Sequence, residues 1–108
     1  MVEKVDHTNF EEKILNAEEP VLLSCLHIDD VDRESRANLS SLSEKFQGRV
    51  KIFLFSSDYF FLCRSFCIIG AIPSFIALKK GKEMVRLYGR VSFDSLLLLC
   101  DNMLPRDH

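Results

Sequence analysis

The sequence predicts one α/β domain with a mixed central sheet and the element order βαβαβαββα. Short apolar runs of strand length alternate with segments of helical periodicity, as in domains whose strands are joined by helices. Two later runs, 74–78 and 83–88, flank a glycine-bearing connection of hairpin length, so the last two strands are expected to be antiparallel. The 108 residues suffice for one hydrophobic core and are too few for two, so we expect residues 1–108 to form a single domain.

The N-terminal part of the chain is expected to hold an edge strand, a helix and a central strand. Residues 2–5 are the candidate edge strand. Thr8-Asn9-Phe10-Glu11 matches a capping box, which predicts a helix running to about Asn16. Pro20 ends any helix, and the nearly unbroken apolar run at 21–26 is typical of a strand covered on both faces.

The middle of the chain continues the alternation. Residues 30–46 have helical spacing, with an apolar face formed by Leu39, Leu42 and Phe46. Gly48 suits the left-handed turn that ends such a helix. A second buried strand is expected at 50–55, and Ser56-Ser57-Asp58 can cap a short helix over 59–66. Strands joined by these helices should be parallel.

The C-terminal part predicts a hairpin followed by a helix. Lys79-Lys80-Gly81-Lys82 supplies the turn between the strands 74–78 and 83–88. Ser92 is expected to cap a last helix that runs to about Met103.

Several stretches resemble the thioredoxin family in residues and spacing. They are Pro20-Val21-Leu22-Leu23, Leu42-Ser43-Glu44-Lys45-Phe46, Ile69-Gly70-Ala71-Ile72-Pro73-Ser74, the hairpin 75–81 and Gly89. The resemblance covers nearly the whole chain and implies the thioredoxin fold, a three-layer α/β/α domain. It also implies a cis peptide bond before Pro73, although only about 5% of X-Pro bonds are cis in general.

The reactive dithiol of that family is replaced in this chain. When the alignment is carried along without a gap, the two cysteines fall on Asp30 and Arg33, and the residues between them on Val31-Asp32. Further departures are Asp29 for the preceding tryptophan, Ser24 for the buried acid and Asn38 for the helix-kinking proline. Disulfide exchange needs a thiolate and a second thiol, which a carboxylate cannot replace. We therefore expect a redox-inactive site in which Asp30 and Asp32 cap the following helix.

The four cysteines lie elsewhere. Cys63 and Cys67 form a CxxxC pair one helical turn apart, where Cβ atoms are about 5–6 Å from each other and too distant for an easy disulfide. Ordinary packing is the leading interpretation, and oxidation or glutathionylation of this pair stays open. Cys25 and Cys100 stand among apolar neighbours and are expected to pack as inert thiols.

Two apolar runs predict exposed apolar surface. Tyr59-Phe60-Phe61-Leu62-Cys63 and Leu96-Leu97-Leu98-Leu99-Cys100 each hold five consecutive apolar residues, more than one buried helical stripe can cover. Contiguous exposed apolar surface commonly marks an interaction site, so Tyr59, Phe60 and Phe61 are candidates for a partner surface. The alternative is that the rest of the fold covers both apolar helices.

Composition excludes several classes of partner. The formal charge is −2 and no basic patch is visible, so nucleic acid is not expected. No apolar segment reaches the roughly 18 residues that span a bilayer. The segment 27–32 lacks the glycine and the oxygen-ligand spacing of a calcium loop, and neither a metal nor a cofactor is expected. With no secretory leader visible, four cysteines favour a reducing, cytoplasmic location.

The leading functional expectation is a redox-silent module that binds a protein or peptide. Its groove is expected to be formed by Asp29, Asp30, Val31, Asp32, Arg33, Ile72, Pro73 and Gly89. Thioredoxins hold extended segments beside their cis-proline by main-chain hydrogen bonds, and this grip needs no sulfur. The alternatives are a thiol oxidoreductase or redox-regulated protein using Cys63 and Cys67, and a homo-oligomer formed through its apolar helices.

Overall fold

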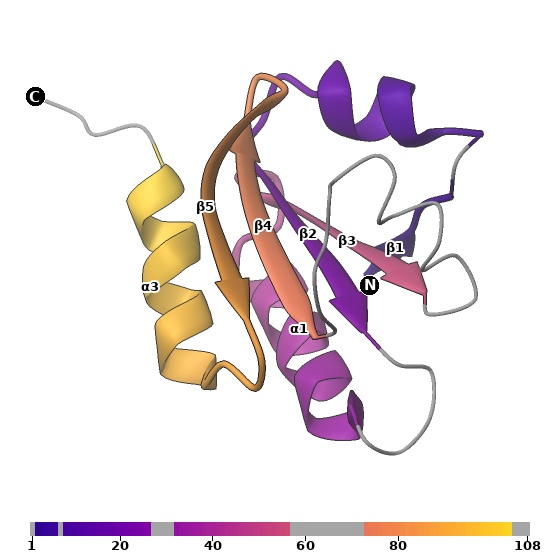
Figure 1. Ribbon diagram of the computed structural model, residues 1–108. Coiled ribbons are helices and arrows are strands. Elements are labelled where there is room, and N and C mark those ends of the chain that lie inside the picture. The colour runs from indigo at the N-terminus through magenta and orange to yellow at the C-terminus, as the bar shows by residue number, and fades with distance from the viewer. Residues whose placement is uncertain (1, 7, 27–31, 57–72, 105–108) are drawn as a thin grey trace, which may run out of the picture.

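A five-stranded mixed sheet is the centre of the protein. The computed structural model describes residues 2–6, 8–26, 32–56 and 73–104, and the statements below concern these residues (Figure 1). The strands lie in the order β1-β3-β2-β4-β5. Their bounds are β1 (Glu3–Lys4), β2 (Val21–Leu26), β3 (Lys51–Ser56), β4 (Ser74–Lys79) and β5 (Lys82–Tyr88).

Strand directions follow the predicted pattern. β3 pairs in parallel with both β1 and β2, whereas β4 is antiparallel to β2 and β5 is antiparallel to β4. All six residues of β2 are buried, as expected for an apolar run with a neighbour on each side and helices on both faces. The expected α/β class with a mixed sheet is therefore confirmed.

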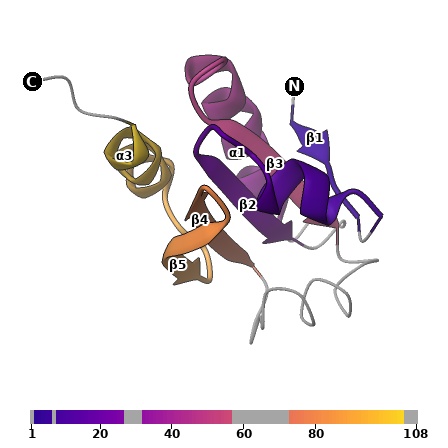
Figure 2. The same cartoon turned by 90° about the horizontal axis from the view of Figure 1, so that it is seen from above.

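Helices cover both faces of this sheet. α1 (Arg33–Lys45) and α3 (Phe93–Met103) lie on one face, and the short π-helical segment η1 (Glu11–Leu15) lies on the other (Figure 2). The core shared by α1 and α3 includes Leu39, Leu42, Leu96 and Cys100 packed on even-numbered residues of β2. On the η1 side, the rings of Phe10 and Phe55 lie 6.2 Å apart. The alternating side chains of β2 thus feed two separate cores.

The predicted N-terminal helix was wrong in its start and its capping. Thr8 does not cap it: its hydroxyl donates to the Asp6 carboxylate, and the Asp6 amide donates to Asn9 Oδ1. The helical segment that follows has no side-chain cap, and the amide of Asn16 donates to the carbonyl of Glu11, five residues earlier. Local Asp and Asn hydrogen bonds have competed with the helix for the same backbone groups.

The hairpin and the last helix agree with their local signals. Lys80 and Gly81 both have positive φ, 52° and 77°, as a two-residue turn between twisted strands requires. Gly48 also has a positive φ, after the end of α1. Ser92 Oγ accepts a hydrogen bond from the amide of Ser95 and so caps α3 as predicted. Among the described helices, none has the length and apolar character needed to cross a membrane.

Candidate functional site

The described residues of the predicted groove, Asp32, Arg33, Pro73 and Gly89, lie at the edge of the sheet where β2 ends. Cys25 of β2 is paired with Ser74 at the start of β4, and Ser74 is paired with Tyr88 at the end of β5. Both α1 and α3 begin at this same edge, as Figure 1 shows. The open edge at the carboxyl ends of parallel strands is where ligands commonly bind in α/β sheets.

A backbone hydrogen bond joins two of the predicted groove residues. The amide of Gly89 donates to the carbonyl oxygen of Pro73 over 2.8 Å. Gly89 has a φ of +82°, and a Cβ placed on it would meet no atom within 4 Å. The glycine is therefore required by its backbone conformation and not by crowding. This bond joins the residue before β4 to the residue after β5 and so extends the pairing of the two strands at this edge of the sheet.

Asp32 and Arg33 mark the start of α1. Asp32 occupies the N-cap position, yet its side chain makes no capping hydrogen bond, so the expected cap was wrong for this residue. The Asp32 carboxylate is nevertheless only 1% exposed, at the positive end of the helix dipole. Arg33 is exposed. Within the described start of α1, the side chains thus offer charge and hydrogen bonds but no sulfur.

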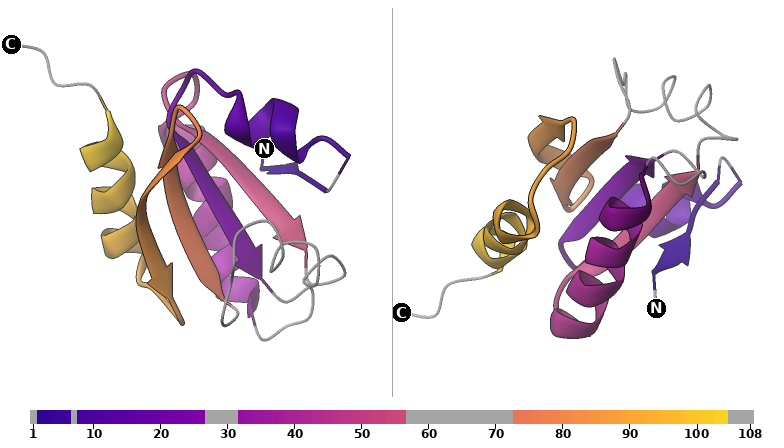
Figure 3. Two further views of the ribbon diagram at one scale, coloured as in Figure 1. Left: turned by 45° about the horizontal axis from the view of Figure 1, so that its top comes forward. Right: turned by 90° about the horizontal axis from the view of Figure 1, so that it is seen from below.

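A polar hollow of about 500 Å³ opens between the first turns of α1 and α3. Figure 3 shows these two helices from below, both on the same side of the sheet. Its lining is Arg33, Glu34, Ser35, Asn38, Arg90, Val91 and Ser92. The guanidinium groups of Arg33 and Arg90 are strong donors for carboxylates and carbonyls. Sequence reasoning missed Arg90, because an isolated arginine after Gly89 carries no motif. Only the packing of α3 beside α1 brings Arg90 to the same hollow as Arg33.

Two buried hydroxyl groups lie close to this edge. Ser24 and Ser74 are fully buried, and their Oγ atoms have no hydrogen-bond partner among the described residues. Ser24 occupies the position at which the thioredoxin resemblance implies a buried acid. A serine hydroxyl with a pKa far above neutrality cannot take up that proton-transfer role. The substitution fits a site without thiol chemistry.

The described cysteines differ in their chemistry. Cys100 is a free, buried thiol, and burial raises its pKa to about 12. Cys25 is buried as expected, but it is disulfide-bonded, so its assignment as an inert thiol was wrong. The second sulfur of that bond lies outside the described residues, since Cys100 is free. Nothing local in the strand sequence indicates a disulfide, because its partner is remote in the chain.

The remaining predicted site residues lie outside the described residues. They are Asp29, Asp30, Val31, Tyr59, Phe60, Phe61, Cys63, Cys67 and Ile72. The cis geometry before Pro73 and the helix at 59–66 likewise stay predictions.

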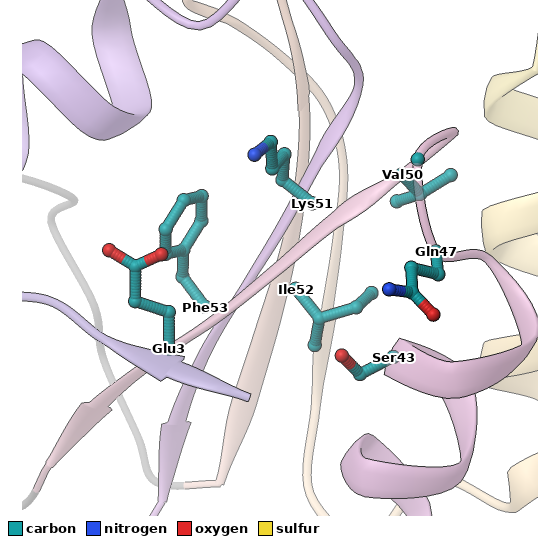
Figure 4. A pocket seen from close by; sticks show the side chains of 8 residues that line it. Glu3, Ser43, Gln47, Val50, Lys51, Ile52 and Phe53 are labelled. Atoms are coloured by element: carbon teal, nitrogen blue, oxygen red, sulfur yellow. The ribbon is translucent and has the colours of Figure 1, made fainter. Parts of the chain in front are cut away.

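A smaller hollow of about 180 Å³ lies at the far side of the sheet, beside the edge strand β1 (Figure 4). Lys51 and Phe53 point to one face of β3, and Val50 and Ile52 point to the other. Its lining combines Glu3 and Lys51 with amide and hydroxyl groups. In the described part of the chain, no group of three His, Cys, Asp or Glu side chains is placed to hold a metal ion.

Comparison with known proteins adds no relative. Neither a scan against protein-family models nor a search of curated proteins finds a match to this chain.

Proposed function

We propose that this protein is a thioredoxin-like module that binds a protein or peptide and performs no dithiol exchange at its α1 edge. The observation that carries the proposal is the start of α1, where Asp32 and Arg33 lie at the sheet edge closed by Pro73 and Gly89. In the thioredoxin resemblance the resolving cysteine falls on Arg33. An arginine can neither attack nor resolve a disulfide.

The sheet supports this proposal. Its order, with parallel β1, β3 and β2 followed by antiparallel β4 and β5, is the order that the resemblance implies. A proline directly before β4 leaves one backbone position without a donor at the sheet edge. A partner segment in extended conformation can add beside it through main-chain hydrogen bonds, with Asp29, Asp30, Val31 and Ile72 lining the groove.

The polar hollow defines the chemistry of the partner. Arg33 of α1 and Arg90, which lies between β5 and α3, both line it, and among the described residues of its lining Glu34 is the only acidic one. Guanidinium groups bind carboxylates through paired hydrogen bonds. The favoured partner segment is therefore extended and acidic at one end.

Peptide binding tests this function. Extended peptides that differ only in an acidic or a basic flank would be titrated against the protein by fluorescence anisotropy. We expect preference for the acidic flank, and loss of that preference in Arg33→Glu/Arg90→Glu. The control Lys4→Glu/Lys82→Glu changes the net charge equally at exposed sites away from the hollow. Equal binding of both peptides by the wild type and both variants would reject the proposed groove.

The disulfide at Cys25 favours a second candidate, a redox-regulated protein that uses Cys63 or Cys67. Insulin reduction with dithiothreitol separates it from the binding module. We expect no acceleration by the wild type beyond that by Cys63→Ser/Cys67→Ser. Turnover near that of an ordinary thioredoxin, lost in the double variant, would replace the binding proposal with an enzyme.

A further inference from the structure

The disulfide in the central strand lies beside a buried hydroxyl group. Cys25 of β2 is disulfide-bonded and 1% exposed. In the pairing of β2 with β4, Cys25 lies directly opposite Ser74, which is 0% exposed. Side chains of directly opposed residues on antiparallel strands point to the same face of the sheet, with Cβ atoms about 4.5–5.5 Å apart. The Ser74 hydroxyl is therefore a close neighbour of the Cys25 sulfur.

The surroundings of this pair are apolar. Cys25 belongs to the core cluster on the η1 face of the sheet, together with Ile76, which follows Ser74 by two positions in β4 and so shares its face. On the other side of β2, Cys25 is paired with Phe55 of β3, which is fully buried and offers no hydrogen bond. Of the two residues paired directly with Cys25, only Ser74 carries a polar side-chain group.

The Ser74 hydroxyl is unsatisfied while the disulfide is present. It has no hydrogen-bond partner among the described residues. A buried polar group without a partner is energetically costly, and native proteins keep few of them. A disulfide sulfur has no proton to donate, whereas a thiol can donate as well as accept, and a charged thiolate accepts more strongly. Ser74 is thus better matched to reduced Cys25 than to oxidised Cys25.

We propose that the Cys25 disulfide is a reversible, thiol-responsive bond, and that Ser74 is the residue that stabilises the reduced sulfur. This inference goes beyond the proposed peptide binding, because it concerns the pairing of β2 with β4 and needs neither the groove nor catalytic turnover. A disulfide that only braces the fold would resist reduction by glutathione.

Reduction by glutathione proceeds through two exchange steps. A glutathione thiolate attacks the sulfur bonded to Cys25, because Cys25 itself is buried and closed to attack. A new S–S bond then joins glutathione to that sulfur, and the electron pair of the broken bond leaves on Cys25, which takes up a proton. A second glutathione thiolate attacks the glutathione sulfur of the mixed disulfide, so that glutathione disulfide departs and the second cysteine is released and protonated. The protein gains two electrons and two protons, and two glutathione molecules are oxidised.

Ser74 acts at the first of these steps and on the final equilibrium. Exchange is faster when the leaving thiolate is better stabilised, and an apolar core alone opposes the formation of a charged sulfur. A hydroxyl that donates to the departing Cys25 thiolate offsets this cost. We therefore expect Ser74 to raise both the rate of reduction and the fraction of reduced protein.

Ser24→Ala supplies a matched control for Ser74→Ala. Ser24 is also 0% exposed, and its hydroxyl likewise lacks a hydrogen-bond partner in the described part of the chain. Ser24 is paired with Phe75, however, and lies on the opposite face of the sheet, among residues that pack against α1 and α3. The two variants thus remove the same buried group from the two sides of the sheet.

Equilibration in glutathione buffers tests the proposal. The wild type and both variants would be incubated at a series of ratios of glutathione to glutathione disulfide, quenched with acid and alkylated, and the Cys25 disulfide would be measured by mass spectrometry. We expect the wild type to pass from oxidised to reduced within the series. Ser74→Ala should favour the disulfide roughly threefold to tenfold more in the equilibrium constant, the net contribution of one hydrogen bond. Ser24→Ala should match the wild type.

Three results would overturn the proposal. A wild-type disulfide that survives the most reducing buffer is a structural brace. An unchanged equilibrium in Ser74→Ala means that the hydroxyl does not stabilise the reduced sulfur. An equal shift in Ser24→Ala assigns the effect to the polarity of the core and not to the residue opposite Cys25. Circular dichroism would confirm that the variants are folded, and Ser74→Thr, which keeps the hydroxyl, should restore the wild-type equilibrium.

Discussion

Gly81 in the hairpin turn lies directly against the backbone carbonyl of Leu15 at the end of η1. A Cβ on Gly81 would sit 2.6 Å from the Leu15 oxygen, and the residue has a φ of +77°. Two requirements therefore meet at one glycine, a left-handed conformation and a close approach to another segment. The contact fixes the β4–β5 turn to the N-terminal part of the chain.

Gly81→Ala should destabilise the protein more than a left-handed alanine alone would. The conformation costs about 1–2 kcal/mol and the clash with a backbone oxygen adds about 1–3 kcal/mol. Gly48→Ala is the matched control, since Gly48 has a φ of +81° and open space around its Cβ position. Urea denaturation of both variants gives the two free energies of unfolding. Equal losses of unfolding free energy in Gly81→Ala and Gly48→Ala would mean that the Leu15 backbone moves aside and the clash adds no cost.

Ser92→Ala should remove the N-terminal cap of α3. The Ser92 hydroxyl accepts from the amide of Ser95 over 3.1 Å, and losing such a cap costs about 0.5–2 kcal/mol. Thr8→Ala is the comparison, because Thr8 caps no helix, and its exposed contact with Asp6 should contribute less than about 0.5 kcal/mol. Thermal unfolding would rank the two. A larger loss of stability in Thr8→Ala than in Ser92→Ala would indicate that Thr8 does cap the N-terminal helix.

Local signals predicted most of the fold. The apolar run of β2, the glycine turn and the Ser92 cap each act within a few residues, so sequence alone places them. The N-terminal helix failed because the Asp6 carboxylate accepts hydrogen bonds from both the amide and the hydroxyl of Thr8, the two groups that the capping box was expected to use. Arg90 and the disulfide of Cys25 were missed for a different reason. Their partners are brought close only by the packing of segments that are distant in the chain.

Cys100 should resist alkylation in the folded protein. Burial raises its pKa to about 12, so at pH 8 roughly one molecule in ten thousand carries the reactive thiolate. Mass spectrometry after iodoacetamide treatment, with and without urea, would measure this protection. Fast labelling of Cys100 in native buffer would contradict the burial of α3 against the sheet.

The same thiol should lower stability at alkaline pH. The unfolded thiol ionises near pH 8.5, and the folded one ionises only near its pKa of about 12. The unfolded state therefore loses its proton first as pH rises, and the free energy of unfolding falls across that window by about 1.4 kcal/mol per pH unit. Between pH 7 and 10 the wild type should lose about 2 kcal/mol more than Cys100→Ala, as urea denaturation would measure. Equal losses of stability in the wild type and in Cys100→Ala would show that the thiol has the same pKa in the folded and the unfolded state.

Reduction should weaken the fold through Cys25 and not through Cys100. The disulfide of Cys25 joins the central strand to a distant part of the chain, and such a bond typically contributes about 2–4 kcal/mol by restricting the unfolded state. Dithiothreitol should therefore lower the melting temperature of the wild type and of Cys100→Ala by similar amounts. Cys25→Ala has no such bond to lose, so its melting temperature should not depend on the reductant. A reductant effect that persists in Cys25→Ala would place the stabilising disulfide elsewhere.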